Sequence, residues 1–165
     1  EISIEDRIRH DGAFFLTFVL KSIRMPKLEP ITIKTKVKQP IEKVWHTWIS
    51  PEHIVNWNFA SPEWHCPRAE NNLIPGGRFS CRMEARDGSM GFDLSGQYDS
   101  VEAPHRLQYH LDDGRKVSLD LFEENGVTLI TQIFEPESSN PIELQRDGWQ
   151  AILNNFSKYT SQLDR

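Results

Sequence analysis

The stretch Leu73-Ile74-Pro75-Gly76-Gly77-Arg78-Phe79-Ser80-Cys81-Arg82-Met83 decides the fold. Its two adjacent glycines end one strand and open the next. From there apolar and polar residues alternate, and this period of two is typical of a half-buried antiparallel strand. We therefore expect Gly76 and Gly77 to serve backbone geometry and Arg78 to face water. The apolar set points to the interior: Phe79, Cys81 and Met83.

Upstream of this stretch, the sequence predicts one strand and two short helices. Residues 31–37 alternate as a strand. Pro40 suits a first helical turn, and apolar residues at helical spacing follow it. Ser50-Pro51-Glu52 is typical of a cap, a first-turn proline and an acidic residue, so a second helix is expected to run toward Trp57. Residues 64–73 predict a second strand ending at Leu73.

Downstream, the pattern predicts an antiparallel meander of strands separated by turns. Strands are expected at 77–85, 92–98, 107–111, 117–121 and 127–133, with turns at 87–89, 112–114 and 124–126. The last element is a long helix, which we expect Asn140 to cap, with Pro141 in its first turn and Glu143 completing a capping box. Its apolar stripe comprises Ile142, Trp149, Ile152, Leu153, Phe156 and Leu163.

Gly148 lies inside this expected helix, where glycine costs about 1 kcal/mol relative to alanine. Two interpretations account for it. The glycine allows a close approach of the helix to the sheet, or it makes room beside Trp149.

The composition bounds the class of protein. A chain of 165 residues suits one domain, and 38% hydrophobic and 26% charged residues are typical of a soluble globular protein. A net charge of −5 argues against nucleic-acid binding. Cys66 and Cys81 lack metal-ligand spacing, and so few cysteines fit a reducing cytoplasm, where we place the protein. Two buried free thiols are the favoured interpretation, and a disulfide is the alternative.

The first 25 residues form an N-terminal extension that precedes an expected domain at 26–165. Its apolar run, Phe14 to Leu20, is far shorter than the roughly 20 residues that a membrane span needs. We interpret the run as a strand or short helix that covers the domain or the partner in a homodimer. A membrane-surface anchor is a second interpretation, and a natural start at Met25 is a third.

Several short pieces recur in the order found in a known family. They are Pro40-Ile41-Glu42-Lys43-Val44-Trp45 with Trp48, Trp57, Pro75-Gly76-Gly77-Arg78-Phe79, Asp87-Gly88-Ser89, Gly96-Gln97-Tyr98, Pro104-His105-Arg106-Leu107 and Gly148-Trp149. Over residues 31–163 the chain resembles START-like (SRPBCC) helix-grip domains, and more specifically bacterial proteins related to the C-terminal domain of the activator of Hsp90 ATPase. The resemblance implies an α+β fold. A curved antiparallel sheet of six to seven strands would wrap around a long C-terminal helix, with two short helices after the first strand.

The resemblance implies three classes of function: small-ligand carriers, polyketide cyclases or aromatases, and co-chaperones. The sequence has no nucleophile elbow, phosphate loop or zinc signature, so we assign no catalytic residue, metal or cofactor. A cyclase or hydrolase would need a positioned acid or base, and no convincing pair stands out. The eukaryotic Hsp90 activators carry a further N-terminal domain, for which this chain has too few residues, so an Hsp90-type partner is not expected.

Our leading hypothesis is therefore a cavity for a small hydrophobic or aromatic molecule between sheet and helix, because ligand sites are mostly apolar with few placed polar groups. Plain core packing is the alternative for each aromatic residue. The candidate lining residues are Trp48, Trp57, His65, Phe79, Cys81, Met83, Phe92, Tyr98, Tyr109, Trp149 and Phe156.

Other polar residues are expected at the surface. Arg82 and Glu84 are predicted to form a cross-strand surface pair. We expect His46, His53 and His65 to be surface or pocket-rim residues, because the break at Pro51 should separate His46 from His53.

Overall fold

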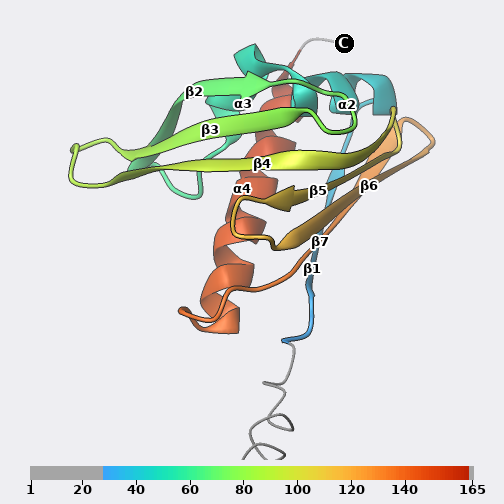
Figure 1. The fold of residues 1–165 in the computed structure, drawn as a ribbon. Helices are drawn as coiled ribbons and strands as arrows, with labels where there is room; N and C mark the ends of the chain where they lie inside the picture. The colour runs from blue at the N-terminus through green and yellow to red at the C-terminus, as the bar shows by residue number, and fades with distance from the viewer. Residues whose placement is uncertain (1–27, 164–165) are drawn as a thin grey trace, which may run out of the picture.

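A computed structural model describes residues 28–163 of the protein (Figure 1). The expectations for the N-terminal extension, for its apolar run and for Met25 lie outside these residues. None of the helices within 28–163 combines the length and the hydrophobicity that a transmembrane span requires.

The described chain forms one antiparallel sheet and three helices in an α+β arrangement. The sheet has seven strands in the order β1-β7-β6-β5-β4-β3-β2. The elements are β1 (Ile31–Val37), α2 (Ile41–Ile49), α3 (Pro51–Trp57), β2 (Trp64–Asn71), β3 (Arg78–Ala85), β4 (Gly91–Glu102), β5 (Arg106–Leu111), β6 (Lys116–Glu124), β7 (Val127–Phe134) and α4 (Ile142–Gln162). This order confirms the predicted helix-grip fold.

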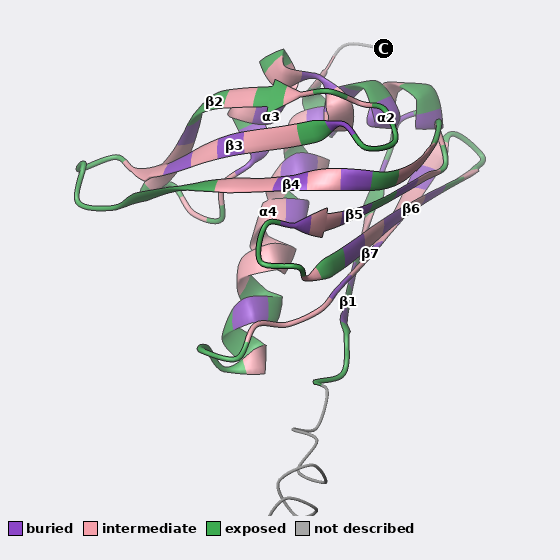
Figure 2. Ribbon diagram, in the orientation of Figure 1, coloured by how far each residue is buried: buried purple, intermediate pink, exposed green. Residues whose placement is uncertain are grey.

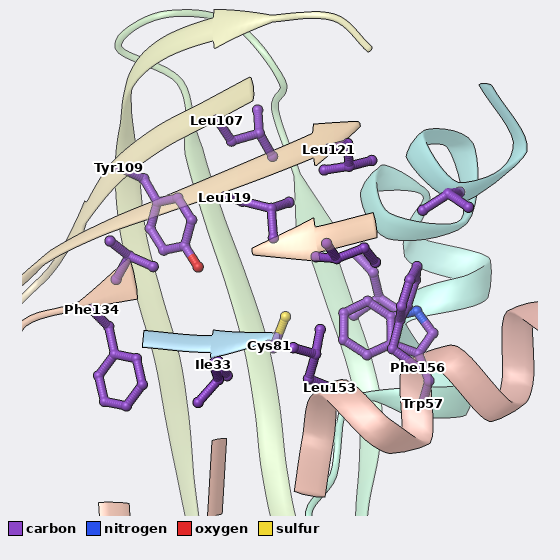
Figure 3. Close-up of a cluster of buried hydrophobic side chains, with 14 of the residues drawn as sticks. Ile33, Trp57, Cys81, Leu107, Tyr109, Leu119, Leu121, Phe134, Leu153 and Phe156 are labelled. Atoms are coloured by element: carbon purple, nitrogen blue, oxygen red, sulfur yellow. The ribbon is translucent and has the colours of Figure 1, made fainter. Parts of the chain in front are cut away.

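The sheet curls around α4, and α2 and α3 close one end of the curl (Figure 1). Burial follows the alternation on the strands, because one face of the sheet meets α4 and the other meets water (Figure 2). On β6, for example, Val117, Leu119 and Leu121 are buried. Leu153 of α4 meets this inner face, whereas Phe156 packs beside Trp57 of α3 (Figure 3).

The turn between β2 and β3 depends on its two glycines. Gly76 has a φ of +79°, which strains residues with a side chain. A Cβ on Gly77 would overlap the carbonyl oxygen of Asn72, so only glycine fits there. The N–H of Gly76 donates to the carbonyl of Tyr98, and the N–H of Tyr98 donates back to Gly77. The turn is thereby bonded to β4, and the expected backbone role of both glycines is confirmed.

Two predicted details of the elements are wrong, and a third, the cap at Ser50, is confirmed in position only. Strand β2 ends at Asn71 rather than Leu73, because the tight turn has already begun. Helix α4 begins at Ile142, and Asn140 does not cap it but donates to Glu137. Ser50 occupies the N-cap position of α3, yet its hydroxyl is bonded to His46 rather than to the backbone of α3.

The break between α2 and α3 does not separate His46 from His53. Their ring centroids lie 5.4 Å apart, with the rings nearly perpendicular. The expectation that Pro51 would part them is wrong, because the change of direction at Ser50 folds α3 back beside the last turn of α2.

Gly148 has open space around the position of a Cβ, with no atom within 4 Å. The expectation of a close approach to the sheet at this glycine is therefore wrong.

We predict that Gly148→Ala raises the free energy of unfolding by about 0.5–1 kcal/mol, because alanine is the better helix former. The midpoint of thermal unfolding should rise by about 2–4 °C. Gly77→Ala is the contrasting variant and should lower the midpoint. A Gly148→Ala protein that melts below the wild type would show that the space is not free.

Candidate ligand-binding cavity

A cavity of about 340 Å³ lies between the inner face of the sheet and the helices α3 and α4. Side chains from β3, β4 and β5 form one wall, and side chains from α3 and α4 face them. The lining comprises Trp48, Ile54, Trp57, Asn58, Glu70, Asn71, Phe79, Cys81, Met83, Phe92, Leu94, Tyr98, Tyr109, Leu111, Arg115, Gln132, Glu137, Asn140, Gln145, Trp149 and Ile152. Figure 3 shows Cys81 and Tyr109 directed from the sheet toward the interior that α4 closes.

Three aromatic rings from consecutive strands pack together on the sheet wall. The Phe79 centroid lies 5.4 Å from that of Tyr98 and 5.1 Å from that of Tyr109, and the two tyrosine rings meet edge to face at 6.0 Å. Such contacts add about 0.5–1.5 kcal/mol per pair beyond burial. They hold the rings in one arrangement and give the wall a fixed shape.

A second aromatic cluster joins α2, α3 and α4 on the opposite side. Trp48 and Trp57 lie 5.0 Å apart, and both contact the ring of Phe156 at 4.8 and 4.9 Å. The indole N–H of Trp57 donates to the carbonyl of Thr47. Trp149 stacks on Phe134 at 4.2 Å, which anchors it to β7.

Two tyrosine hydroxyls belong to the aromatic cluster of the sheet wall. Tyr98 donates to Oδ1 of Asn71 at 2.9 Å, and Asn71 donates to the carbonyl of Ile49 at 2.6 Å. The Tyr109 hydroxyl accepts a hydrogen bond from Gln132 at 3.2 Å. Among the described residues the Tyr109 hydroxyl has no acceptor of its own, so its proton is free for a ligand.

Burial raises the pKa of both Tyr98 and Tyr109 above the ordinary value of tyrosine. In each case the neighbouring buried groups add to this effect, while the hydrogen-bond partner opposes it. Both side chains are therefore neutral phenols near pH 7 and act as hydrogen-bonding groups.

Cys81 of the cavity wall and Cys66 of β2 are buried free thiols. A hydrogen bond to Cys66 and burial raise the pKa of the Cys81 thiol, which keeps it protonated. A thiol must ionise to act as a nucleophile, so Cys81 serves as a small apolar lining group. The prediction of two buried free thiols is confirmed.

Charged and amide side chains gather where the β5–β6 hairpin approaches the start of α4. Arg115 forms an ion pair with Asp113 at 2.8 Å. The amide of Gln145 donates to the carbonyls of Glu137 and Asn140 and accepts from the N–H of Glu137. Gln145 thereby holds the loop that precedes α4 against the helix.

The family described as "Activator of Hsp90 ATPase homolog 1-like protein" matches residues 38–161. This match spans most of the chain and includes every residue that lines the cavity. The chain belongs to this family.

Solved structures of similar proteins agree with this assignment to the Hsp90-activator-like family. The AHSA1-like protein from Aeromonas hydrophila is 39% identical, with a TM-score of 0.76 over 83% of this chain and 99% of that chain. Chr148 from Cytophaga hutchinsonii is 49% identical, with a TM-score of 0.70 over 79% and 90%. NE0264 from Nitrosomonas europaea shares the fold at 20% identity and a TM-score of 0.69, over 81% and 94%. A comparison with curated proteins gives no match.

The structure brings the sequence-predicted site residues to the cavity with two exceptions. His65 lies on the outer face of the sheet, where its Nε2 is 3.7 Å from Glu84. Phe156 is fully buried in the core between Trp48 and Trp57 and does not line the cavity.

The predicted positions of Arg78, Arg82 and Glu84 are confirmed in part. Arg78 faces water and pairs with Asp112 at 2.6 Å. Arg82 and Glu84 also lie on the outer face, yet they pair with each other along β3 at 2.8 Å rather than across strands. The cross-strand partner of Arg82 is Asp93 at 3.7 Å.

Sequence reasoning missed most polar lining residues of this family member, namely Asn58, Glu70, Asn71, Arg115, Gln132, Glu137, Asn140 and Gln145. Two of them carried a signal. Gln132 shares the inward parity of Ile130 and Phe134 on β7, and Gln145 lies four residues before Trp149 on α4. A polar residue in an apolar alternation indicates a buried hydrogen bond or a site.

We predict that stability falls steeply above about pH 10, where the tyrosines of the unfolded chain ionise while Tyr98 and Tyr109 do not. Each group can contribute a slope of up to about 1.4 kcal/mol per pH unit. Urea unfolding of Tyr98→Phe/Tyr109→Phe between pH 9 and 11 should give a shallower slope. Phe79→Leu removes a ring from the same cluster without an ionisable group and should keep the wild-type slope. Equal slopes in all three proteins would contradict this explanation.

Proposed function

We propose that this protein binds one small, largely apolar or aromatic molecule in the cavity between the sheet and α4. The observation that carries the proposal is the unfilled volume of about 340 Å³, which lies within the range of small-molecule sites of roughly 300–1,000 Å³. Protein interiors ordinarily fill such space with side chains. A retained volume inside an otherwise packed domain supports a binding role.

The lining supports a flat ligand with one hydrogen-bond acceptor. Aromatic residues lie on both sides: the Phe79 cluster on the sheet, and Trp57 and Trp149 on the helices. Rings favour offset or edge-to-face packing against other rings. The unused proton of Tyr109 gives such a ligand one directional contact.

An enzyme that uses the same cavity has less support. Tyr98 and Tyr109 converge within the lining, but both are neutral phenols near pH 7. His65, the other candidate acid or base, lies on the outer face beside Glu84. A reducing compartment such as the cytoplasm suits the proposed carrier, since its two cysteines are free.

A cavity-filling substitution tests the proposal. The neutral dye N-phenyl-1-naphthylamine should bind the wild-type protein with an increase in dye fluorescence. Ile152→Trp replaces an aliphatic lining side chain with a larger indole ring, which fills part of the cavity. This variant should bind the dye about tenfold or more weakly, the equivalent of 1.4 kcal/mol. Leu144→Trp introduces the same side chain at a residue of α4 that is 60% exposed, and this variant should bind as the wild type does. Equal affinity of the three proteins, or no binding by the wild type, would contradict the proposal.

A pair of related ligands tests the role of Tyr109. We expect Tyr109→Phe to weaken binding of 2-acetylnaphthalene by about 3- to 10-fold, because the carbonyl acceptor loses one net hydrogen bond. Binding of naphthalene, which has no acceptor, should be unchanged. Titration calorimetry of both ligands distinguishes the lost hydrogen bond from a general change in the cavity, which would weaken both.

A further inference from the structure

His46, Glu52 and His53 form a cluster at the junction of α2 and α3, outside the cavity lining. One ligand-type atom from each residue lies within 4.8 Å of the others. His46 comes from the last turn of α2, and Glu52 and His53 come from the first turn of α3. His46 and Glu52 are exposed, so they can adjust their side chains without disturbing the core.

Both histidines of the cluster are oriented by a hydroxyl group. Nδ1 of His46 is 3.1 Å from Oγ of Ser50, and Nδ1 of His53 is 2.9 Å from the hydroxyl of Tyr159 on α4. Metal-binding histidines characteristically use one ring nitrogen for such an orienting hydrogen bond and the other for the metal. In both residues Nε2 is the nitrogen left to bind an ion.

Glu52 supplies the negative charge. Its backbone carbonyl accepts a hydrogen bond from Asn56, but within residues 28–163 its carboxylate forms no ion pair. No cation of the described chain neutralises this carboxylate. Together with the two imidazoles, it gives a mixed nitrogen and oxygen donor set.

We propose that His46, Glu52 and His53 bind a divalent transition metal ion, Zn²⁺ in preference to Mg²⁺ or Ca²⁺. Imidazole nitrogen suits zinc, copper and nickel, whereas magnesium and calcium require oxygen ligands. In a tetrahedral zinc site with bonds near 2.1 Å, ligand atoms lie about 3.4 Å apart. The donor atoms now lie within 4.8 Å of one another, so coordination would require the exposed His46 and Glu52 side chains to rotate until the atoms reach that spacing. Water completes the coordination.

The bound ion would connect two helices that are joined through Ser50, whose N–H donates to His46 of α2 and whose carbonyl accepts from His53 of α3. It would also act on α4, because Tyr159 is bonded to His53. Binding to the folded state alone raises stability by mass action. The proposal is independent of the cavity, since none of the three residues lines it.

Titration calorimetry of the full chain with ZnCl₂ tests the site, in buffer free of chelators. We expect one Zn²⁺ per chain and a higher midpoint of thermal unfolding when Zn²⁺ is present, with no heat from MgCl₂. His46→Gln and Glu52→Gln should each weaken Zn²⁺ binding by about tenfold or more. His105→Gln replaces an exposed histidine on the β4–β5 turn and should bind as the wild type does.

Tyr159→Phe separates metal binding from a structural role of the histidines. It leaves all three ligands in place but removes the orienting hydroxyl, and should weaken Zn²⁺ binding by about 10- to 100-fold. Far-ultraviolet circular dichroism in the absence of metal checks that each variant is folded. The proposal would be overturned if the wild-type protein did not bind Zn²⁺. It would also be overturned if His46→Gln and Glu52→Gln both bound Zn²⁺ with the wild-type affinity.

Discussion

The close approach of Gly77 to the carbonyl oxygen of Asn72 determines how β3 enters the sheet. Because the turn is bonded to Tyr98 of β4 on both sides, it holds β3 and β4 in one register. A slip of one residue would turn every side chain of β3 to the opposite face. Phe79, Cys81 and Met83 would then face water, and Arg78 and Arg82 would enter the interior. The cavity therefore depends on a close contact between Gly77 and Asn72, neither of which lines it.

The cavity stays unfilled because the polar atoms of three aromatic residues that line it are hydrogen-bonded to neighbouring groups of the protein. The Trp57 indole is bonded to Thr47, the Tyr98 hydroxyl to Asn71, and the Tyr109 hydroxyl to Gln132. A ring that rotated into the cavity would leave one of these buried groups unsatisfied, at a cost of about 1–3 kcal/mol. The hydrogen bonds thus keep the walls apart, while the ring contacts keep each wall rigid.

The fold could be predicted from the sequence because its signals are local. Alternation on the strands and the stripe on the last helix report burial directly, and the Asp112–Gly114 and Glu124–Gly126 turns mark where strands end. The alternation on the strands also predicted their apolar lining residues, because every second residue of a strand faces the same side of the sheet. His65 was misplaced because a β-bulge between His65 and Arg68 changes the phase of β2. Phe156 was misassigned because helical spacing cannot tell a lining position from one buried between two tryptophans. The approach of His46 to His53 depends on the angle between two helices, which no local pattern encodes.

The hydrogen-bonded series from Tyr98 through Asn71 to the carbonyl of Ile49 links the cavity wall to the end of α2. A guest molecule that took the Tyr98 hydroxyl would compete with Asn71, whose amide holds the C-terminus of that helix. Where a guest weakens the bond from Asn71 to Ile49, thermodynamic reciprocity requires that strengthening this bond weakens binding of the guest by the same factor. The two ends of this series are therefore coupled, although Tyr98 belongs to β4 and Ile49 to α2, which is a helix outside the sheet.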